Sequence, residues 1–180
     1  MSIGKAHGTN RQYQVTCRDA LTFREPALSP WHGDGIDVSF DLPDTRWTFD
    51  VALREPSGAL VVVECRRTIG AVKQEDVAAF AYKVESLRKS LGIPVAGIFI
   101  TKKAHQIGAV RVGQFNGIDL AVLEEGSAPP GFNITFLQYD AERETKCRDI
   151  IMHAPPGSYS LTGMPVTLVH GKTSGESDKR

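Results

Sequence analysis

At 180 residues with 41% hydrophobic side chains, the chain is long enough to bury one core and falls in the one-domain range. Its 21 basic and 21 acidic residues cancel, so a polyanion would have to bind a local patch rather than a globally basic protein. The three scattered cysteines contain no CxxC pair, which predicts a reducing, cytoplasmic location without a zinc site. No apolar run reaches the roughly 18 residues of a membrane helix, and the N-terminus lacks a signal-peptide core, so we expect no membrane partner.

The N-terminal residues 1–35 are expected to form an arm and a loop before the first regular strand. Two interpretations remain open inside this arm: a short helix over 16–24, or an edge strand over 12–17. Residues 36–42 alternate between apolar and polar side chains, which is the period-2 pattern of a strand.

Residues 46–54 and 59–66 are predicted to be two strands of one hairpin. The connecting sequence EPSGA places a proline where φ is preset for a type I turn and a glycine where the left-handed conformation is needed. This chemistry favours a three-residue loop, in which the numbers of facing residues sum to 114. Asp50 then lies opposite Glu64 and Thr48 opposite Arg66 on one face, a register that a two-residue loop would break.

The other face of the same hairpin is predicted to be apolar. It pairs Phe49, Val51 and Leu53 with the facing residues of the second strand, among them Cys65. On the polar face, two carboxylates about 4 Å apart repel by roughly 4 kcal/mol at a protein-surface dielectric. A cation must therefore lie beside Asp50 and Glu64, either a metal ion or a nearby arginine.

The rest of the chain predicts alternating helices and strands. Helices are expected from Val72 or Gln74 to Leu91 and over 104–116, and strands over 94–101 and 118–123. This order implies parallel crossovers with helices on the faces of a mixed sheet. Further strands are expected over 132–139 and 161–169. The predicted division is a core over 36–124, a C-terminal β appendage over 125–170 and a disordered tail over 171–180.

Several segments resemble the PD-(D/E)XK nuclease superfamily, and within it the Mrr-like, restriction-endonuclease-like branch. They are Phe49-Asp50-Val51, VVECR over 62–66, the helical sequence VKQEDVAAFAYKVESL and the closing sequence GIFITKKAHQIGAVRVGQFNGIDL. The resemblance spans about residues 36–123. It implies a three-layer α/β/α core with a mixed central sheet and extra β structure at the C-terminus.

The resemblance also implies an active site that hydrolyses DNA phosphodiester bonds with Mg²⁺ or Mn²⁺. Asp50, Glu64 and the backbone carbonyl of Cys65 would hold the metal, since hard divalent cations take oxygen ligands. The family has a catalytic lysine two residues after the glutamate, and Arg66 stands at that position here. Arginine stabilises developing negative charge but cannot lose a proton to act as a base.

Three interpretations of the arginine substitution remain open. Arg66 could stabilise charge while a metal hydroxide attacks, Lys73 or Lys83 from the following helix could replace the lysine, or Arg66 could take the place of the metal in an inactive site. Gln74, at the start of that helix, is a further candidate catalytic residue, as glutamines on this helix contact the site in some members of the family.

Arg67, Lys102 and Lys103 are candidate nucleic-acid-binding residues, because they follow strands near the expected site. For each of these residues, an ordinary solvated surface charge is the competing interpretation. The function expected overall is a metal-dependent endonuclease of the restriction or repair type that acts on DNA, with a homodimer expected by analogy. The alternative is a catalytically inactive nuclease-fold module that binds nucleic acid or a protein partner.

Overall fold

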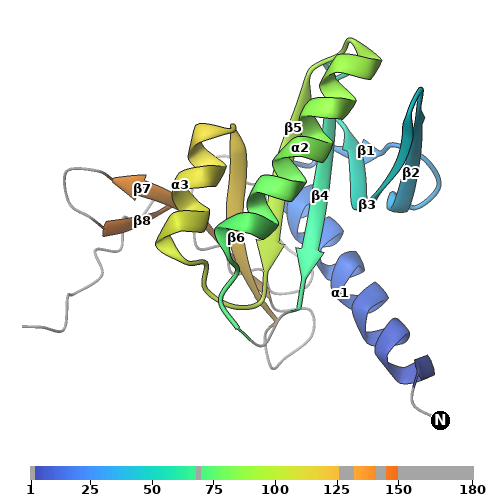
Figure 1. Ribbon diagram of the computed structural model, residues 1–180. Coiled ribbons are helices and arrows are strands. Elements are labelled where there is room, and N and C mark those ends of the chain that lie inside the picture. The colour runs from blue at the N-terminus through green and yellow to red at the C-terminus, as the bar shows by residue number, and fades with distance from the viewer. Residues whose placement is uncertain (1–2, 68–69, 126–131, 141–144, 150–180) are drawn as a thin grey trace, which may run out of the picture.

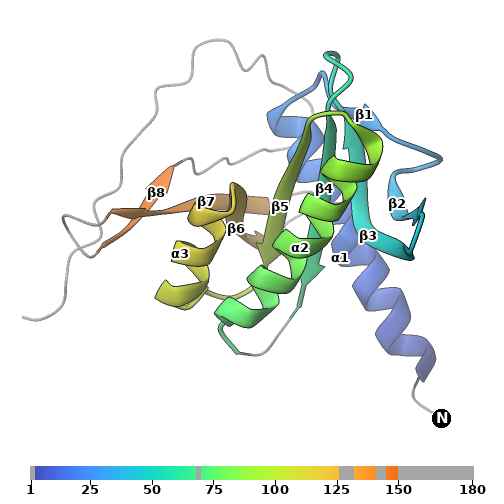
Figure 2. The ribbon, with the colours of Figure 1, turned by 45° about the horizontal axis from the view of Figure 1, so that its top comes forward.

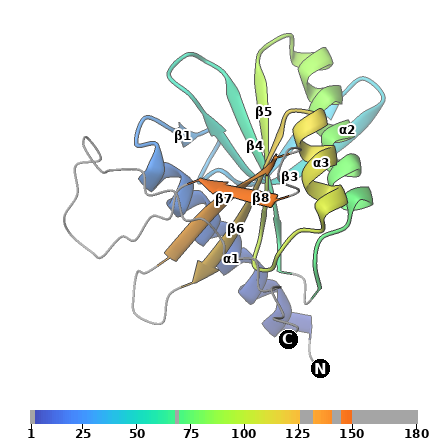
Figure 3. The same ribbon diagram turned by 90° about the vertical axis from the view of Figure 1, so that its left-hand side faces the viewer.

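The protein consists of three layers, with one mixed sheet between a single helix and a pair of helices (Figure 1, Figure 3). The computed structural model describes residues 3–67, 70–125, 132–140 and 145–149; for 3–9, 138–140 and 145–149 only the backbone is described. The α/β three-layer architecture expected from the sequence is confirmed. The helices and strands in chain order are α1 (Ile3–Arg24), β1 (Ser29–Pro30), β2 (Ile36–Leu42), β3 (Thr45–Arg54), β4 (Leu60–Arg66), α2 (Gln74–Leu91), β5 (Val95–Thr101), α3 (Ile107–Phe115), β6 (Ile118–Glu125), β7 (Phe132–Asp140) and β8 (Thr145–Asp149).

The N-terminal arm is one helix, α1, which is longer than the helix expected over 16–24. The alternative of an edge strand over 12–17 is wrong. Tyr13, Cys17, Ala20 and Leu21 are all buried, and their three- and four-residue spacing places them on one helical face. That face packs on the sheet, which makes α1 the layer opposite α2 and α3 (Figure 2).

The sheet runs in the order β1-β3-β4-β5-β6-β7-β8, with β2 beside β3. Strands β4, β5 and β6 are parallel and are joined through α2 and α3, so the predicted crossovers are confirmed. The strand expected over 132–139 is β7, which extends the sheet antiparallel to β6. Strand β8 was not expected, while the strand expected over 161–169 and the tail over 171–180 lie outside the described residues.

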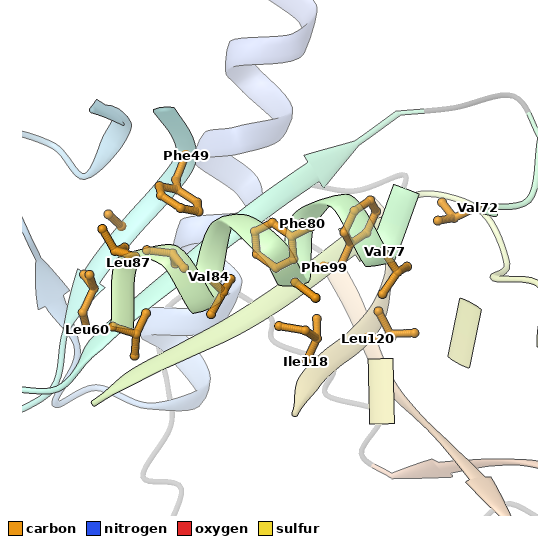
Figure 4. Packing of buried hydrophobic residues seen from close by; sticks show 14 of the residues in the cluster. Phe49, Leu60, Val72, Val77, Phe80, Val84, Leu87, Phe99, Ile118 and Leu120 are labelled. Atoms are coloured by element: carbon orange, nitrogen blue, oxygen red, sulfur yellow. The ribbon is translucent and has the colours of Figure 1, made fainter. Parts of the chain in front are cut away.

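Two apolar clusters stabilise the layers, one on each face of the sheet. Beneath α2 and α3, Phe80 contacts Phe49 and Phe99 edge to face, with ring centroids 6.2 and 5.6 Å apart (Figure 4). On the α1 side, Tyr13 and Cys17 pack with strand residues of β3 to β6. Helices α1 and α2 are thereby fixed on opposite faces of β3 and β4, around the end of β4 where the acidic residues lie.

The predicted hairpin loop is confirmed. The Glu55 N–H donates to the Ala59 carbonyl at 2.9 Å, and Gly58 has a φ of 86°, in the left-handed region that glycine occupies without strain. The register pairs Val51 with Val63 and Arg54 with Leu60, so facing numbers sum to 114 as expected.

The prediction that Phe49, Val51 and Leu53 share a face is wrong. Phe49 lies in the cluster beneath α2, whereas Val51 and Leu53 lie in the cluster beneath α1. In the neighbouring strand β2, the side chains also switch from one face of the sheet to the other, at Asp37. The φ of Asp37 is 52°, which is rare for a residue other than glycine. This distortion of β2 and β3 is centred on Asp37 and Asp50.

Candidate functional site

A cavity of about 320 Å³ opens between α1 and the end of β4. It combines side chains from the N-terminal helix with those of the hairpin, which the sequence places far apart. The residues that line it are Asn10, Tyr13, Gln14, Asp50, Glu64, Cys65, Arg66 and Arg67. Five of the predicted site residues therefore meet in one place: Asp50, Glu64, Cys65, Arg66 and Arg67.

Asp50 is held in one orientation by two hydrogen bonds. The backbone N–H of Cys65 donates to Oδ2 at 2.6 Å, and the Gln14 side-chain amide donates to Oδ1 at 2.8 Å. Backbone pairing of β3 with β4 stops at Val51 and Val63, so the Asp50 side chain takes up the Cys65 N–H that the ladder leaves unpaired.

The Gln14 amide also links Asp50 to a third carboxylate. The same Nε2 donates to Asp37 Oδ1 at 2.9 Å, and Arg11 contacts Asp37 Oδ2 at 3.2 Å and Asp34 Oδ2 at 2.8 Å. Asp37 and Asp50 belong to neighbouring strands. One amide from α1 therefore bridges two carboxylates that would otherwise repel each other.

Glu64 is nearly buried and is paired with two cations. Arg66 Nη2 lies 2.8 Å from Oε1, and Lys83 Nζ on α2 lies 3.4 Å from Oε2. Burial raises the pKa of Glu64 above its usual range, and the negative charge of Asp50 raises it further, while Lys83 and Arg66 act in the opposite direction. The net upward shift of this pKa shows that the two cations do not fully offset burial and the Asp50 charge.

The two carboxylates meet at the cavity without forming the predicted cross-strand pair. Both line the cavity, and Asp50 acts electrostatically on Glu64. The ladder, however, ends before Asp50 and Glu64 pair, and Thr48 bonds to Ser39 at 2.8 Å instead of facing Arg66. Gln14 of α1 holds Asp50 and Lys83 of α2 contacts Glu64, so helices on opposite faces of the sheet each contact one of the two carboxylates that line the cavity.

The cavity has oxygen ligands of the kind that a hard divalent cation takes, and each of the four carboxylate oxygens also has a hydrogen-bond or ion-pair partner within the protein. Asp50 and Glu64 provide carboxylate oxygens, and the Cys65 carbonyl lies on the same side of β4 as its N–H, toward Asp50. Within the described parts of the chain, no three His, Cys, Asp or Glu side chains are grouped to hold a metal ion. A bound cation would therefore take the backbone carbonyl, water or a phosphate oxygen as its remaining ligands.

Lys73 and Gln74 are not among the residues that line the cavity. The backbone N–H of Lys73 donates to Asp76 at 3.3 Å, which caps the start of α2. The side chain of Gln74 packs against Gly108 of α3. The structure thus places Lys83, and not Lys73, beside Glu64.

The three predicted nucleic-acid-binding residues lie in different surroundings. Arg67 lines the cavity and has its guanidinium 5.9 Å from the centre of the Tyr13 ring. Lys102 pairs with Glu125 at 2.8 Å, and Lys103 is exposed just after β5. Of the three, only Arg67 belongs to the cavity.

The sequence analysis missed the contribution of α1 to this site. Asn10, Tyr13 and Gln14 lie on the helix that was left ambiguous, although the spacing of Tyr13 and Cys17 carried a helical signal. Burial raises the pKa of the Tyr13 hydroxyl and of the Cys65 thiol, so both stay protonated at neutral pH. The Tyr13 hydroxyl and the Cys65 thiol therefore add no negative charge to the cavity.

Three solved structures resemble this fold. They are an EndoMS–dsDNA2 complex (TM-score 0.47, 23% identity, 62% of this chain and 44% of that one), a repair endonuclease from Pyrococcus abyssi (TM-score 0.44, 21% identity, 59% and 45%), and EndoMS in apo form (TM-score 0.38, 26% identity, 59% and 43%). The chain spans less than half the length of each of these structures. No protein-family model and no curated protein sequence matches the chain.

The Pyrococcus abyssi protein is named as a repair endonuclease. Every TM-score is below 0.5, so the likeness carries no argument about function. Among the described residues, no helix is both long and apolar enough to cross a membrane.

Proposed function

We propose that this protein is a metal-dependent endonuclease that hydrolyses DNA phosphodiester bonds. The observation that carries the proposal is the convergence of Asp50 and Glu64 on one cavity, with basic side chains on the same wall. A phosphodiester substrate needs both features, since a metal ion needs anionic oxygens and the phosphate needs cations. Mg²⁺ or Mn²⁺ is the proposed cofactor, and when bound it supplies water activation and stabilisation of the transferring phosphoryl group.

The chain's own residues have separate roles in this proposal. Asp50 and Glu64 hold the cation together with the Cys65 carbonyl, and Gln14 keeps the Asp50 carboxylate oriented toward the cavity. Arg67 lies at the cavity wall, where a guanidinium can bind a neighbouring phosphate oxygen.

Lys83 is the residue we propose in place of the family's missing lysine. It belongs to α2 rather than β4, yet its Nζ lies 3.4 Å from Glu64 Oε2. The Lys83 side chain is 25% exposed, compared with 50% for Arg66, so its charge is the less screened of the two.

The second candidate function is a catalytically inactive module that binds nucleic acid or a protein partner. The observation that favours it is the short Arg66–Glu64 ion pair, 2.8 Å long, which already neutralises one of the proposed metal ligands. In that case the arginine takes the place of the cation. The two candidates differ in whether a divalent metal displaces Arg66 from Glu64.

Cleavage of a supercoiled plasmid in Mg²⁺ or Mn²⁺ tests the proposed activity. We expect nicking or linearisation that stops with chelator and in Asp50→Asn. We also expect Lys83→Met to lower the rate by about 10²- to 10³-fold, the usual loss for a positioned charge-stabilising group. Asp41→Asn is the matched control, because Asp41 is a strand carboxylate whose side chain is 80% exposed. Cleavage that persists in Asp50→Asn would place the activity elsewhere.

A homodimer acting on duplex DNA remains part of the proposal. Two-fold assemblies suit substrates with two antiparallel strands, so a dimer would place two cavities on the two backbones. Sedimentation of the full chain with and without DNA measures this directly.

A further inference from the structure

Two aromatic side chains and a lysine form an aromatic shelf beside the acidic pair. The shelf consists of Trp47 on β3 and Tyr82 and Lys83 on α2. The Trp47 and Tyr82 rings meet edge to face with centroids 6.3 Å apart, and Lys83 Nζ lies 5.8 Å from the centre of the Trp47 ring. The shelf therefore joins the same two elements that supply Asp50 and hold Glu64.

Lys83 connects the shelf directly to the proposed active site. Its Nζ contacts the Trp47 ring and also lies 3.4 Å from Glu64 Oε2. Trp47 is three residues before Asp50 in the same strand, about 10 Å away along it. The three shelf residues are not among those that line the cavity, so Lys83 is the link between the shelf and the acidic pair.

The Tyr82 ring lies at the surface of α2 and is not part of the apolar core. Tyr82 is 67% exposed, whereas Phe80, two residues earlier on α2, is 2% exposed and packs in the apolar cluster. Trp47 is half-buried, and its ring contacts the Tyr82 ring edge to face. The tyrosine ring is consequently held by a neighbour and still open to solvent, which is the arrangement that stacking on a planar ligand needs.

We propose that the aromatic shelf binds an unpaired nucleobase of the strand whose phosphate lies at the acidic pair. The inference rests on the proposed function and adds the substrate class: nucleic acid with at least one unstacked base next to the cleaved bond. A nucleobase offers a π-face that stacks on tyrosine or tryptophan whatever its sequence, and the adjacent backbone carries the negative charge that Lys83 attracts. A base in an intact duplex is already stacked and would have to leave the stack, at a cost in free energy, before it could lie on the shelf.

Binding of short oligonucleotides to the full chain without metal tests this inference. The probes are an octathymidylate, the same octamer with abasic residues, an octauridylate and a blunt duplex, all measured by fluorescence in Trp31→Phe, where Trp47 is the remaining tryptophan. We expect the octathymidylate to quench Trp47 and to bind at least about 10-fold more tightly than the abasic octamer or the duplex. An octauridylate that binds as well assigns recognition to the base rather than the sugar.

Three variants separate stacking from other effects. Tyr82→Ala should weaken octathymidylate binding by about 5- to 100-fold and leave abasic binding unchanged, whereas Tyr82→Phe should stay within about threefold. Phe115→Ala is the matched control: Phe115 is 90% exposed, lies at the end of α3 and should have no effect. Equal binding of the thymidine and abasic octamers, or equal losses in Tyr82→Ala and Phe115→Ala, would overturn the shelf.

Failure of this inference is distinguishable from failure of the proposed function. If Tyr82→Ala binds octathymidylate like the unaltered chain while plasmid cleavage still depends on Asp50, the shelf is wrong and the nuclease stands. If no probe binds and no plasmid is cut, both proposals fall.

Discussion

Gln14 is the residue whose replacement most directly tests how Asp50 is held. Gln14→Leu keeps the size and the helix propensity of the side chain but removes the amide that donates to both Asp50 and Asp37. Hydrogen bonds to charged groups are each worth about 1.5–3 kcal/mol. Since both bonds share one nitrogen and the Asp37 side chain is 51% exposed, we expect a combined loss of about 2–3 kcal/mol in the free energy of unfolding.

Urea denaturation at neutral pH measures this loss, with the midpoint expected to fall and the slope to stay the same. Gln12→Leu is the control, because it makes the same chemical change at an exposed position two residues earlier on α1. Its effect on the free energy of unfolding should be within about 0.5 kcal/mol. Equal stabilities of the two variants would refute the argument that the Gln14 amide bridges the carboxylates.

Three further predictions concern the core and the pH dependence of stability. Gly97→Ala should cost about 1–3 kcal/mol, because the new Cβ would lie 2.7 Å from Ile118 and 2.9 Å from Val84 in a buried layer, and thermal unfolding measures it. Gly108→Ala should stay within about 1 kcal/mol in the same assay, since its new Cβ meets the flexible end of a glutamine side chain and alanine favours the helix. Burial, and then the Asp50 charge, raise the pKa of Glu64 in the folded protein. Protonated Glu64 therefore stabilises the folded state at low pH, and this contribution is lost as pH rises through the raised pKa. Glu64→Gln should therefore gain stability relative to the unaltered chain as pH rises above about 4, the ordinary range of a glutamate, in urea titrations; a stability difference that stays constant with pH would contradict it.

Local sequence patterns were sufficient to predict most of the sheet. The alternation over 36–42 and the turn chemistry of EPSGA gave β2 and the register of the hairpin, because both depend on short-range sterics. The helix spacing after Arg67 gave α2, whose start and end carry the expected charges and Gly92. The strand β8 carries no clear period-2 pattern, and this edge strand beside β7 was therefore not predicted.

Three of the eight residues that line the cavity, all on α1, depended on contacts that no local pattern encodes. The break in alternation at Phe49 and Val51 arises from the distortion shared by Asp37 and Asp50, which neither strand shows alone. Gln14 reaches Asp50 across 36 positions of sequence because α1 crosses behind the hairpin (Figure 1). Lys83 was one of two lysines weighed as a substitute, and only its place on the inner side of α2 singles it out.

Binding of Mn²⁺ to the full chain, followed by electron paramagnetic resonance and calorimetry without nucleic acid, tests the central claim most directly. The account predicts one site whose affinity falls at least about 10-fold in Asp50→Asn and in Glu64→Gln and is unchanged in Asp41→Asn. Mn²⁺ that binds the unaltered chain and Asp50→Asn equally well, or does not bind at all, would contradict a metal site at the end of β4.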